Sequence, residues 1–266
     1  MACGKTVRLG RILDLSGRGT VILPVDHGAY MGPIRGLEKP LDVIRVAVEA
    51  GVDSILLNKG LLKRCASEIA RAPRPVGLVL RASGAFVARE PPEFEALISS
   101  AREALALGAD AVAFTMYVGG RRHEEVVRAF GELVAECESW GVPVLGECLP
   151  SSELGSGVKA VKVAARVGAE LGADVVKTIY AEPFEEVVDS CPVPIVIAGG
   201  RKRDAVGVLA EVKRAMEAGA AGVCIGRNVF QHDNPRAMLE AILKIVKEGA
   251  KLEEALRVAG VSGAEA

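Results

Sequence analysis

The sequence Leu171-Gly-Ala-Asp-Val-Val-Lys-Thr-Ile-Tyr180 decides how the rest of the chain is interpreted. Its centre, from Asp174 to Ile179, is a short run rich in valine and isoleucine, which is typical of a buried strand in a parallel sheet. Lys177 lies within this run, although burying an ammonium group is costly. Either Lys177 lies near the strand end and reaches solvent, or it points into a pocket where desolvation lowers its pKa. In the second case the neutral amine can form a Schiff base with a carbonyl.

Similar stretches recur along the whole chain. Each combines the end of a helix, a glycine suited to the left-handed C-cap position and a short apolar strand. They are Glu49–Leu57, Ala106–Phe114, Glu170–Thr178 and Glu217–Ile225. Four other apolar strands are expected between them, at Gly19–Val25, Val76–Leu80, Val142–Glu147 and Val193–Ala198. Interleaved, the two sets give eight strands.

Helical patterns, with apolar residues at three- and four-residue spacing, follow these strands. The expected helices are Leu37–Ala50, Pro92–Leu107, His123–Trp140, Gly155–Leu171, Pro183–Ser190, Arg203–Ala218 and Pro235–Gly249, with a short helix at Thr6–Leu15 before the first strand. Eight strand–helix units predict an α/β protein with a (β/α)₈ (TIM) barrel. A doubly wound open sheet is the alternative, but no strand is followed by Gly-x-Gly-x-x-Gly. Because no linker divides the chain, we expect residues 1–266 to form one domain.

The composition argues against several classes of function. The formal net charge is −1 and aromatic residues make up 4% of the chain, so neither a basic field nor a stacking platform for nucleic acid is expected. No apolar run approaches the roughly 18 residues of a membrane span, and the N-terminus has no secretory h-region. The six cysteines form no Cys-x-x-Cys pair and the three histidines lie on different units. We therefore expect a cytoplasmic protein without a metal site or a disulfide framework.

In a (β/α)₈ barrel the active site lies at the C-terminal ends of the strands. Polar side chains stand there in this chain, because Asp26 and His27 follow the first strand and Tyr117, Glu147 and Lys177 end later ones. A lysine nucleophile needs a partner that moves protons to and from the carbinolamine. Asp26 is the best-placed candidate, and Tyr117 and Glu147 are further candidates. His27 is a candidate substrate- or phosphate-binding residue, and a structural hydrogen bond suits it at least as well as acid–base work.

The ends of the seventh and eighth strands predict a phosphate site. Neither Gly199 nor Gly200 has a Cβ atom, so both can bring backbone N–H groups close to an anion. Gly226 and Arg227 add a guanidinium group just before a short segment at Val229–His232. Barrels of this type often bind phosphate in these two loops and at the start of a short extra helix.

Four motifs, in this order, resemble the archaeal-type class I fructose-bisphosphate aldolase family. That family also includes an aminodideoxyheptulosonate synthase and a thiolase that acts on a phosphorylated pentanedione. The motifs are Asp26-His-Gly-Ala-Tyr-Met-Gly-Pro33, Val175-Val-Lys-Thr178, Val196-Ile-Ala-Gly-Gly200 and Gly226-Arg-Asn-Val-Phe-Gln231. The resemblance extends from Arg8 to Ile245, nearly the whole chain.

The resemblance implies a (β/α)₈ barrel that needs no metal or other cofactor, forms a homo-oligomer (often a decamer) and acts on a phosphorylated small molecule. It makes Lys177 the Schiff-base lysine and Asp26 an acid–base or orienting residue. It also places Gly199, Gly200, Gly226 and Arg227 in the phosphate-binding loops.

The chain departs from the family pattern after the fifth strand. The aldolase and synthase branches carry a tyrosine two residues beyond the position of Glu147, and Leu149 stands there in this chain. We expect an enzyme that makes or breaks a carbon–carbon bond in a phosphorylated ketose through a lysine imine. It should cleave fructose bisphosphate poorly, or use a substitute base such as Glu147.

Three alternatives remain. One is a thiolase with coenzyme A as co-substrate, which is favoured by stretches such as Val79-Leu-Arg-Ala-Ser-Gly84, Tyr117-Val-Gly-Gly120 and Cys191-Pro-Val-Pro-Ile-Val196. The others are the heptulosonate synthase and a barrel that binds a sugar phosphate without catalysis.

Overall fold

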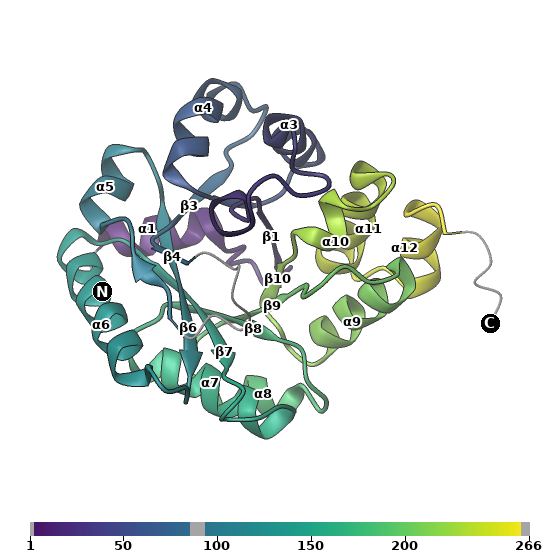
Figure 1. Cartoon of the computed structure of the whole chain (residues 1–266). Helices are drawn as coiled ribbons and strands as arrows, with labels where there is room; N and C mark the ends of the chain where they lie inside the picture. The colour runs from purple at the N-terminus through teal and green to yellow at the C-terminus, as the bar shows by residue number, and fades with distance from the viewer. Residues whose placement is uncertain (1–2, 86–93, 262–266) are drawn as a thin grey trace.

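Eight parallel strands close into a barrel (Figure 1) in the computed structural model, which describes residues 3–85 and 94–261. Their order around the barrel is β1-β10-β9-β8-β7-β6-β3-β2. The strands are β1 (Thr20–Pro24), β2 (Ser54–Leu57), β3 (Gly77–Arg81), β6 (Ala111–Val118), β7 (Val144–Pro150), β8 (Val175–Ile179), β9 (Ile195–Ala198) and β10 (Gly222–Cys224). The predicted (β/α)₈ barrel is confirmed, and the open sheet is excluded.

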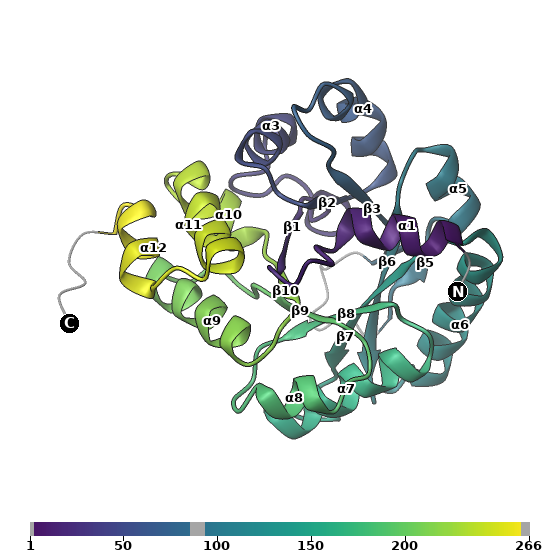
Figure 2. The ribbon, with the colours of Figure 1, turned by 180° about the vertical axis from the view of Figure 1, so that it is seen from behind.

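A ring of helices surrounds the strands (Figures 1 and 2). The ring consists of α3 (Pro40–Ala50), α4 (Lys59–Ala70), α5 (Ala101–Ala106), α6 (His123–Trp140), α7 (Val158–Glu170), α8 (Glu185–Asp189), α9 (Ala205–Glu217) and α11 (Pro235–Glu248). Four further helices are α1 (Cys3–Ile12), α2 (Gly28–Met31), α10 (Arg227–Phe230) and α12 (Leu252–Val258). Within the described ranges, no helix is both long and apolar enough to cross a membrane.

The four repeated stretches have the same local structure. Their glycines, Gly51, Gly108, Gly172 and Gly219, all have positive φ angles between 78° and 103° and follow the ends of helices, as expected for left-handed C-caps. In three of them an aspartate at the start of the strand accepts a hydrogen bond from a backbone N–H of the neighbouring strand. These bonds are Val21 N to Asp53 (2.7 Å), Leu78 N to Asp110 (3.1 Å) and Val144 N to Asp174 (2.8 Å). The repeat therefore fixes the N-terminal end of the barrel.

Helix α1 lies across this N-terminal end (Figure 2). Two of its cations bind repeat aspartates: Lys5 Nζ lies 2.9 Å from Asp174, and Arg11 Nη1 lies 2.9 Å from Asp110. Lys5 is only 1% exposed and also bonds to Glu138. The helix begins and ends three residues earlier than the Thr6–Leu15 expected from sequence, and Ile12 at its end joins the apolar cluster inside the barrel. Its C-terminal end therefore closes this side of the barrel.

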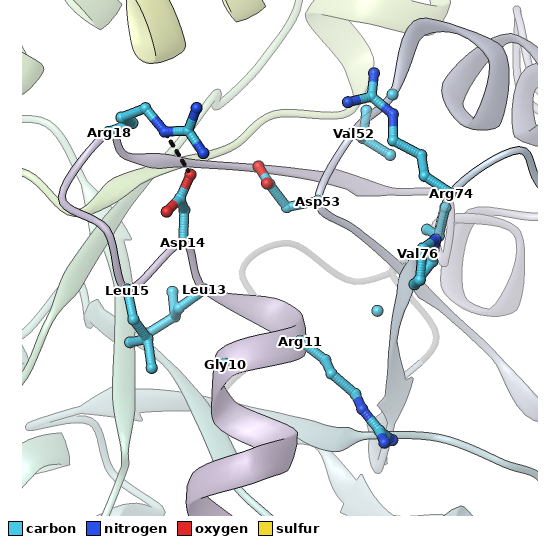
Figure 3. A pocket seen from close by; sticks show the side chains of 13 residues that line it. Gly10, Arg11, Leu13, Asp14, Leu15, Arg18, Val52, Asp53, Arg74 and Val76 are labelled. Carbon is cyan, nitrogen blue, oxygen red and sulfur yellow. Dashed lines mark ion pairs between the residues drawn. The ribbon is translucent and has the colours of Figure 1, made fainter.

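A cavity of about 340 Å³ lies beside α1, at the start of β3. Figure 3 shows that the guanidinium groups of Arg11, Arg18 and Arg74 point to different sides of this cavity. Arg18 pairs with Asp14 at 3.5 Å and Arg11 with Asp110, so two of these cations are neutralised locally. The three guanidinium groups therefore do not converge on one position in the cavity.

Some elements differ from the sequence-based predictions. The predicted helix Pro92–Leu107 is wrong in the described part of its first half. Helix α5 begins only at Ala101, where the Ser100 side chain caps it. The preceding residues instead form β5 (Ala96–Leu97), which pairs with β4 (Ser83–Gly84) in a small antiparallel hairpin. Pro92 itself lies outside the described residues.

Two strands are longer than expected. Strand β7 continues past Glu147 to Pro150, and β6 continues to Val118. Tyr117 and Leu149 therefore lie within strands and are paired in register. Helices α4 and α12 were not assigned from the sequence.

Candidate active site

The alternation of side chains along the strands positions the site. Apolar residues from the strands, such as Val79, Ala113, Leu145 and Val175, fill the interior of the barrel. Because strand side chains alternate between faces, the residues two positions further on also point inward. These residues are polar: Arg81, Thr115, Glu147 and Lys177. The register pairs Thr115 with Glu147 and Glu147 with Lys177, so these three lie in one row across β6, β7 and β8.

Lys177 is buried and forms an ion pair. It is 6% exposed, and its Nζ lies 2.6 Å from Oε1 of Glu147. The interpretation in which Lys177 reaches solvent is therefore wrong. The expected lowering of its pKa is also wrong. Burial does oppose the charge on Lys177, but Cys224 and the Glu147 carboxylate more than offset burial and raise the pKa of this lysine above its usual value.

Arg81 joins the two carboxylates predicted to move protons. Its Nε donates to Oδ2 of Asp26 at 2.7 Å, and its Nη2 donates to Oε2 of Glu147 at 2.8 Å. Its Nη1 donates to Oγ1 of Thr115 at 2.8 Å, and that hydroxyl in turn lies 3.2 Å from Glu147. Burial disfavours ionised Glu147, but Lys177 and Arg81 together hold the pKa of Glu147 below its usual range. Glu147 therefore carries a negative charge between two cations.

Asp26 and His27 lie at the end of β1. Asp26 is 1% exposed, and its second oxygen, Oδ1, lies 3.4 Å from Nδ1 of His27. The His27 ring packs edge-on against Phe230, with ring centroids 5.2 Å apart. Burial lowers the pKa of His27 to about 4, so its imidazole is neutral at pH 7. Arg227 is close enough to contribute to this lowering, so His27 lies between Asp26 and the predicted phosphate loops.

Tyr117 lies next to Leu149, and Leu149 occupies the position at which the related branches carry their tyrosine. The two are cross-strand neighbours on β6 and β7. Burial, together with Glu95 and Glu147, raises the pKa of the Tyr117 hydroxyl, so this phenol is neutral and lies close to both carboxyl groups. Tyr30 is also half-buried, and burial and Asp26 raise the pKa of its hydroxyl. Both phenols are therefore neutral and close enough to feel the charge of Arg81.

The predicted phosphate loops are connected by Asn228, which is fully buried on α10. Its Nδ2 donates to the carbonyl oxygens of Gly199 (2.6 Å) and Arg201 (3.1 Å), and its Oδ1 accepts from Arg203 N at 2.8 Å. Gly200 has a φ angle of 65°, a conformation that favours glycine. Asn228 therefore fixes the loop after β9 against α10.

The adjoining residues leave little room for larger side chains. A Cβ atom at Gly199 would lie 2.7 Å from Ile225, and one at Gly226 would lie 2.6 Å from the Pro24 carbonyl. The Nε atom of Arg227 is buried, and no described residue accepts a hydrogen bond from it. These two loops therefore present the Arg227 guanidinium and closely approachable backbone.

The structure brings the predicted residues to one end of the barrel. Lys177 and Glu147 are in direct contact, and Arg81 connects Glu147 to Asp26. Sequence reasoning did not assign roles to Arg81, Thr115, Glu95 or Asn228. The alternation of β3 and β6 beyond Val79 and Ala113 could have indicated Arg81 and Thr115. Nothing in the sequence pattern indicated Glu95, because its approach depends on the β4–β5 hairpin.

Among residues 3–85 and 94–261, no cluster of three or more His, Cys, Asp or Glu side chains is arranged to hold a metal ion.

A buried lysine that faces the C-terminal mouth of a (β/α)₈ barrel, beside a carboxylate that can take its proton, defines a class of enzymes that work through a lysine imine. The comparisons with known proteins agree with this class. The model of the DeoC/LacD family aldolases matches residues 20–232, and the chain belongs to this family. The resemblance drawn from the four motifs is thereby confirmed.

Its relatives represent the three branches of that resemblance. The chain is 36% identical to 2-amino-3,7-dideoxy-D-threo-hept-6-ulosonate synthase 1 of Archaeoglobus fulgidus, over 97% of this chain and 96% of that protein. It is 37% identical to the 3-hydroxy-5-phosphonooxypentane-2,4-dione thiolase of Klebsiella pneumoniae, over 95% and 84% of the two chains. A crystal structure of an archaeal fructose 1,6-bisphosphate aldolase superposes with a TM-score of 0.80 at 26% identity, covering 92% of this chain and all of that one. A Schiff base-forming fructose-1,6-bisphosphate aldolase gives the same TM-score at 27% identity.

Proposed function

We propose that this enzyme makes or breaks a carbon–carbon bond in a phosphorylated ketose or related ketone through an imine on Lys177. The observation that carries the proposal is the ion pair between buried Lys177 and Glu147, since an amine in this position needs a nearby group to take its proton. The relatives named as Schiff base-forming aldolase, synthase and thiolase support the same chemistry.

The geometry suggests how the imine forms. Glu147 accepts a proton from the Lys177 ammonium, and the neutral amine attacks the ketone carbon. The oxygen of the resulting carbinolamine then takes a proton back from Glu147 and leaves as water, which gives the iminium. Arg81 keeps the Glu147 carboxylate in place during this exchange. The iminium can then accept the electrons of the neighbouring carbon–carbon bond.

The phosphate of the substrate is proposed to bind between Gly199–Gly200 and Gly226–Arg227. Arg227 supports this placement because its buried Nε has no acceptor among the described residues. Hydrogen bonds to charged groups contribute about 1.5–3 kcal/mol each. Arg227→Ala should therefore weaken binding of a phosphorylated ligand by about tenfold or more, measured by competition with inorganic phosphate. An unchanged affinity would place the phosphate elsewhere.

Reduction with borohydride tests the imine. Incubation with a panel of phosphorylated ketoses and diones, followed by borohydride, should add the reduced ligand to Lys177, located by peptide mass spectrometry. Lys177→Ala should form no adduct. The matched control is Lys59→Ala, which removes a half-exposed lysine at the end of another strand and should leave the adduct intact. An adduct on Lys59 or Lys202 in the wild type would contradict the proposal.

The thiolase reaction is a second candidate, and Leu149 favours it. Cleavage of a ketose requires a base for the hydroxyl group on the bond that breaks, and leucine cannot supply one. Cleavage of a β-dione by coenzyme A needs no such base, because attack of the thiol on the second carbonyl activates the bond. Turnover only with a phosphorylated dione and coenzyme A would establish this reaction. Fast cleavage of fructose bisphosphate that is lost in Glu147→Gln would establish the aldolase with a substitute base.

We further propose a homo-oligomer located in the cytoplasm, for which the family resemblance suggests a decamer. Exposed apolar side chains, including Val7, Trp140, Val163 and Val206, support association between copies. Mass photometry of the purified protein measures the assembly, and a monomer at micromolar concentration would contradict it.

A further inference from the structure

The β4–β5 hairpin carries a carboxyl group toward the site from outside the barrel strands. Ser83 pairs with Leu97, and the Ile98 N–H donates to the Ala82 carbonyl at 2.7 Å, so the returning chain is held against the end of β3. Glu95 precedes this returning strand. Its Oε2 accepts a hydrogen bond from Oγ of Ser83 at 2.6 Å.

Ser83 places this carboxyl group over the polar row of the barrel. Ser83 is fully buried, and its Oγ also accepts the Thr115 N–H at 2.9 Å. Thr115 belongs to the row that contains Glu147 and Lys177. Glu95 is also close enough to raise the pKa of Tyr117, the cross-strand neighbour of Leu149. The Glu95 carboxyl group thus lies on the side of the site where the related branches have a tyrosine.

The two cations of the site form ion pairs with carboxylates other than Glu95. Arg81 binds both Asp26 and Glu147, and Lys177 binds Glu147. In the described part of the chain, Glu95 has a hydroxyl partner, Ser83, but no cation in contact. Because three carboxyl groups share two cations, the one without a direct cation is the one that keeps a proton most easily.

The pKa shifts agree with this assignment. Burial raises the pKa of Glu95, with nearby Glu147 acting in the same direction, although Arg81 and Ser83 partly oppose the rise. Glu147 shifts the opposite way, since Lys177 and Arg81 hold it ionised against its burial. Two carboxyl groups whose surroundings push their pKa values apart are suited to act as acid and base.

We propose that Glu95 donates a proton to the substrate carbon next to the Lys177 imine. This inference deepens the proposed function and rests on it. When the carbon–carbon bond breaks, its electron pair enters the iminium and leaves an enamine. The enamine carbon then takes the proton of the Glu95 carboxyl group, the iminium re-forms, and Glu95 is left as a carboxylate. Both the aldol cleavage and the thiol-driven cleavage leave this enamine, so both need the same proton.

Hydrogen exchange isolates this step. Dihydroxyacetone phosphate in D₂O should form the imine on wild-type enzyme and exchange the hydrogen on the carbon that becomes the enamine, as followed by NMR. In Glu95→Gln we expect the exchange rate to fall by about 100-fold or more. Borohydride trapping on Lys177 should stay within about twofold of wild type, because Glu147 still serves the nitrogen. If Glu95 had only a structural role, hydrogen exchange and borohydride trapping would fall together in Glu95→Gln.

Controls distinguish the possible failures. Glu103→Gln, which removes a carboxylate from α5 that pairs with Lys59, should leave both exchange and trapping unchanged. The melting temperature of Glu95→Gln should be no lower than that of wild type, because glutamine cannot ionise in this half-buried position. An exchange rate in Glu95→Gln equal to that of wild type would overturn this inference but leave the proposed function standing. An equal loss of exchange and of borohydride trapping would do the same. A wild-type enzyme that neither traps nor exchanges the ketone would instead contradict the proposed function.

Discussion

At the scale of single residues, the reactivity of Lys177 depends on its neighbours more than on its burial. Burial by itself would lower the pKa of the amine. Cys224 and the Glu147 carboxylate, which lies 2.6 Å from the amine, together reverse that effect, so the resting lysine is charged and faces a base. The ion pair therefore stores the proton that the carbinolamine needs later, when it loses water.

Replacing Glu147 tests this arrangement. In Glu147→Gln the pKa of Lys177 should fall, so the pH dependence of borohydride trapping should move to lower pH. Turnover should nevertheless drop by about 100- to 10,000-fold, because the carbinolamine has lost its acid–base partner. Wild-type turnover in this variant would contradict the role.

The same residue affects stability against acid. The folded protein lowers the pKa of Glu147, so its contribution to stability is present above its unfolded pKa of about 4.3 and is lost as the pH falls toward the folded value. Denaturant unfolding of wild type and Glu147→Gln between pH 3 and 7 should show a smaller acid-dependent loss in the variant. Parallel curves would contradict this contribution.

Asp26 has a separable role at the other end of the Arg81 guanidinium. Asp26→Asn keeps the shape of the side chain and leaves Arg81 bound to Glu147, so we expect the fold to persist while kcat falls by about 100-fold or more. The measurements are kcat and the melting temperature. Normal turnover here, together with an inactive Glu147→Gln, would assign the proton transfers to β7 alone.

At the scale of elements, helix periodicity and turn residues predicted the helix bounds correctly where the local sequence determines them. The bounds of α6, His123–Trp140, match the expected ones, because apolar spacing runs through the helix and Gly141 ends it with a φ angle of 61°. The same reasoning failed before α5, where pairing of Ala96–Leu97 with Ser83–Gly84 determines the conformation. Tertiary pairing of this kind leaves no periodic signal in the chain.

The residues of the site divide in the same way, into those that the local sequence predicts and those that only the folded barrel brings together. Strand ends and motifs predicted Lys177, Glu147 and the glycine loops, since each follows a recognisable strand. Alternation along β3 indicates that Arg81 points inward, but its partners could not be predicted. Asp26, Thr115 and Glu147 come from three other parts of the barrel and meet only when it closes. Contacts across a barrel depend on register, which the sequence specifies only through the whole fold.

The connection between the loop after β9 and α10 offers an element-scale prediction. Asn228→Ala removes three hydrogen bonds, all at least partly buried, that hold Gly199, Arg201 and Arg203 in place. We expect KM for a phosphorylated substrate to rise about tenfold or more with little change in kcat, because the bonds position phosphate donors away from the reacting carbon. A fall in kcat at constant KM would contradict a role confined to phosphate binding.

At the scale of the whole molecule, α1 connects the N-terminus to the starts of β8 and β6, the two strands on either side of β7. Lys5 contacts Asp174 at the start of β8 and Glu138 on α6, while Arg11 contacts Asp110 at the start of β6. Asp110 and Asp174 therefore have two tasks, because they cap neighbouring strands and also anchor this helix.

Lys5→Ala should expose the importance of that anchor. Removing one partner of a buried ion pair costs about 3–5 kcal/mol, and the lower end applies here because Glu138 is partly exposed. A chain of this length should then melt roughly 6–12 °C lower, at about 2–4 °C per kcal/mol. Differential scanning calorimetry measures the shift in melting temperature. The control is Lys63→Ala, which removes a solvent-exposed lysine. Equal melting temperatures for the two variants would contradict the anchoring role.

The position of α1 also has a kinetic consequence. With this helix across the N-terminal end of the barrel, reactants reach Lys177 and products leave it at the C-terminal ends of the strands. A fragment released by bond cleavage must therefore leave past the portion still attached to the lysine before a second reactant can take its place. For a transfer in which the first fragment leaves before the second reactant binds, this traffic gives a ping-pong order, in which double-reciprocal plots at several fixed concentrations of the second reactant are parallel. The coenzyme A reaction, in which the thiol attacks before the bond breaks, should give intersecting lines instead.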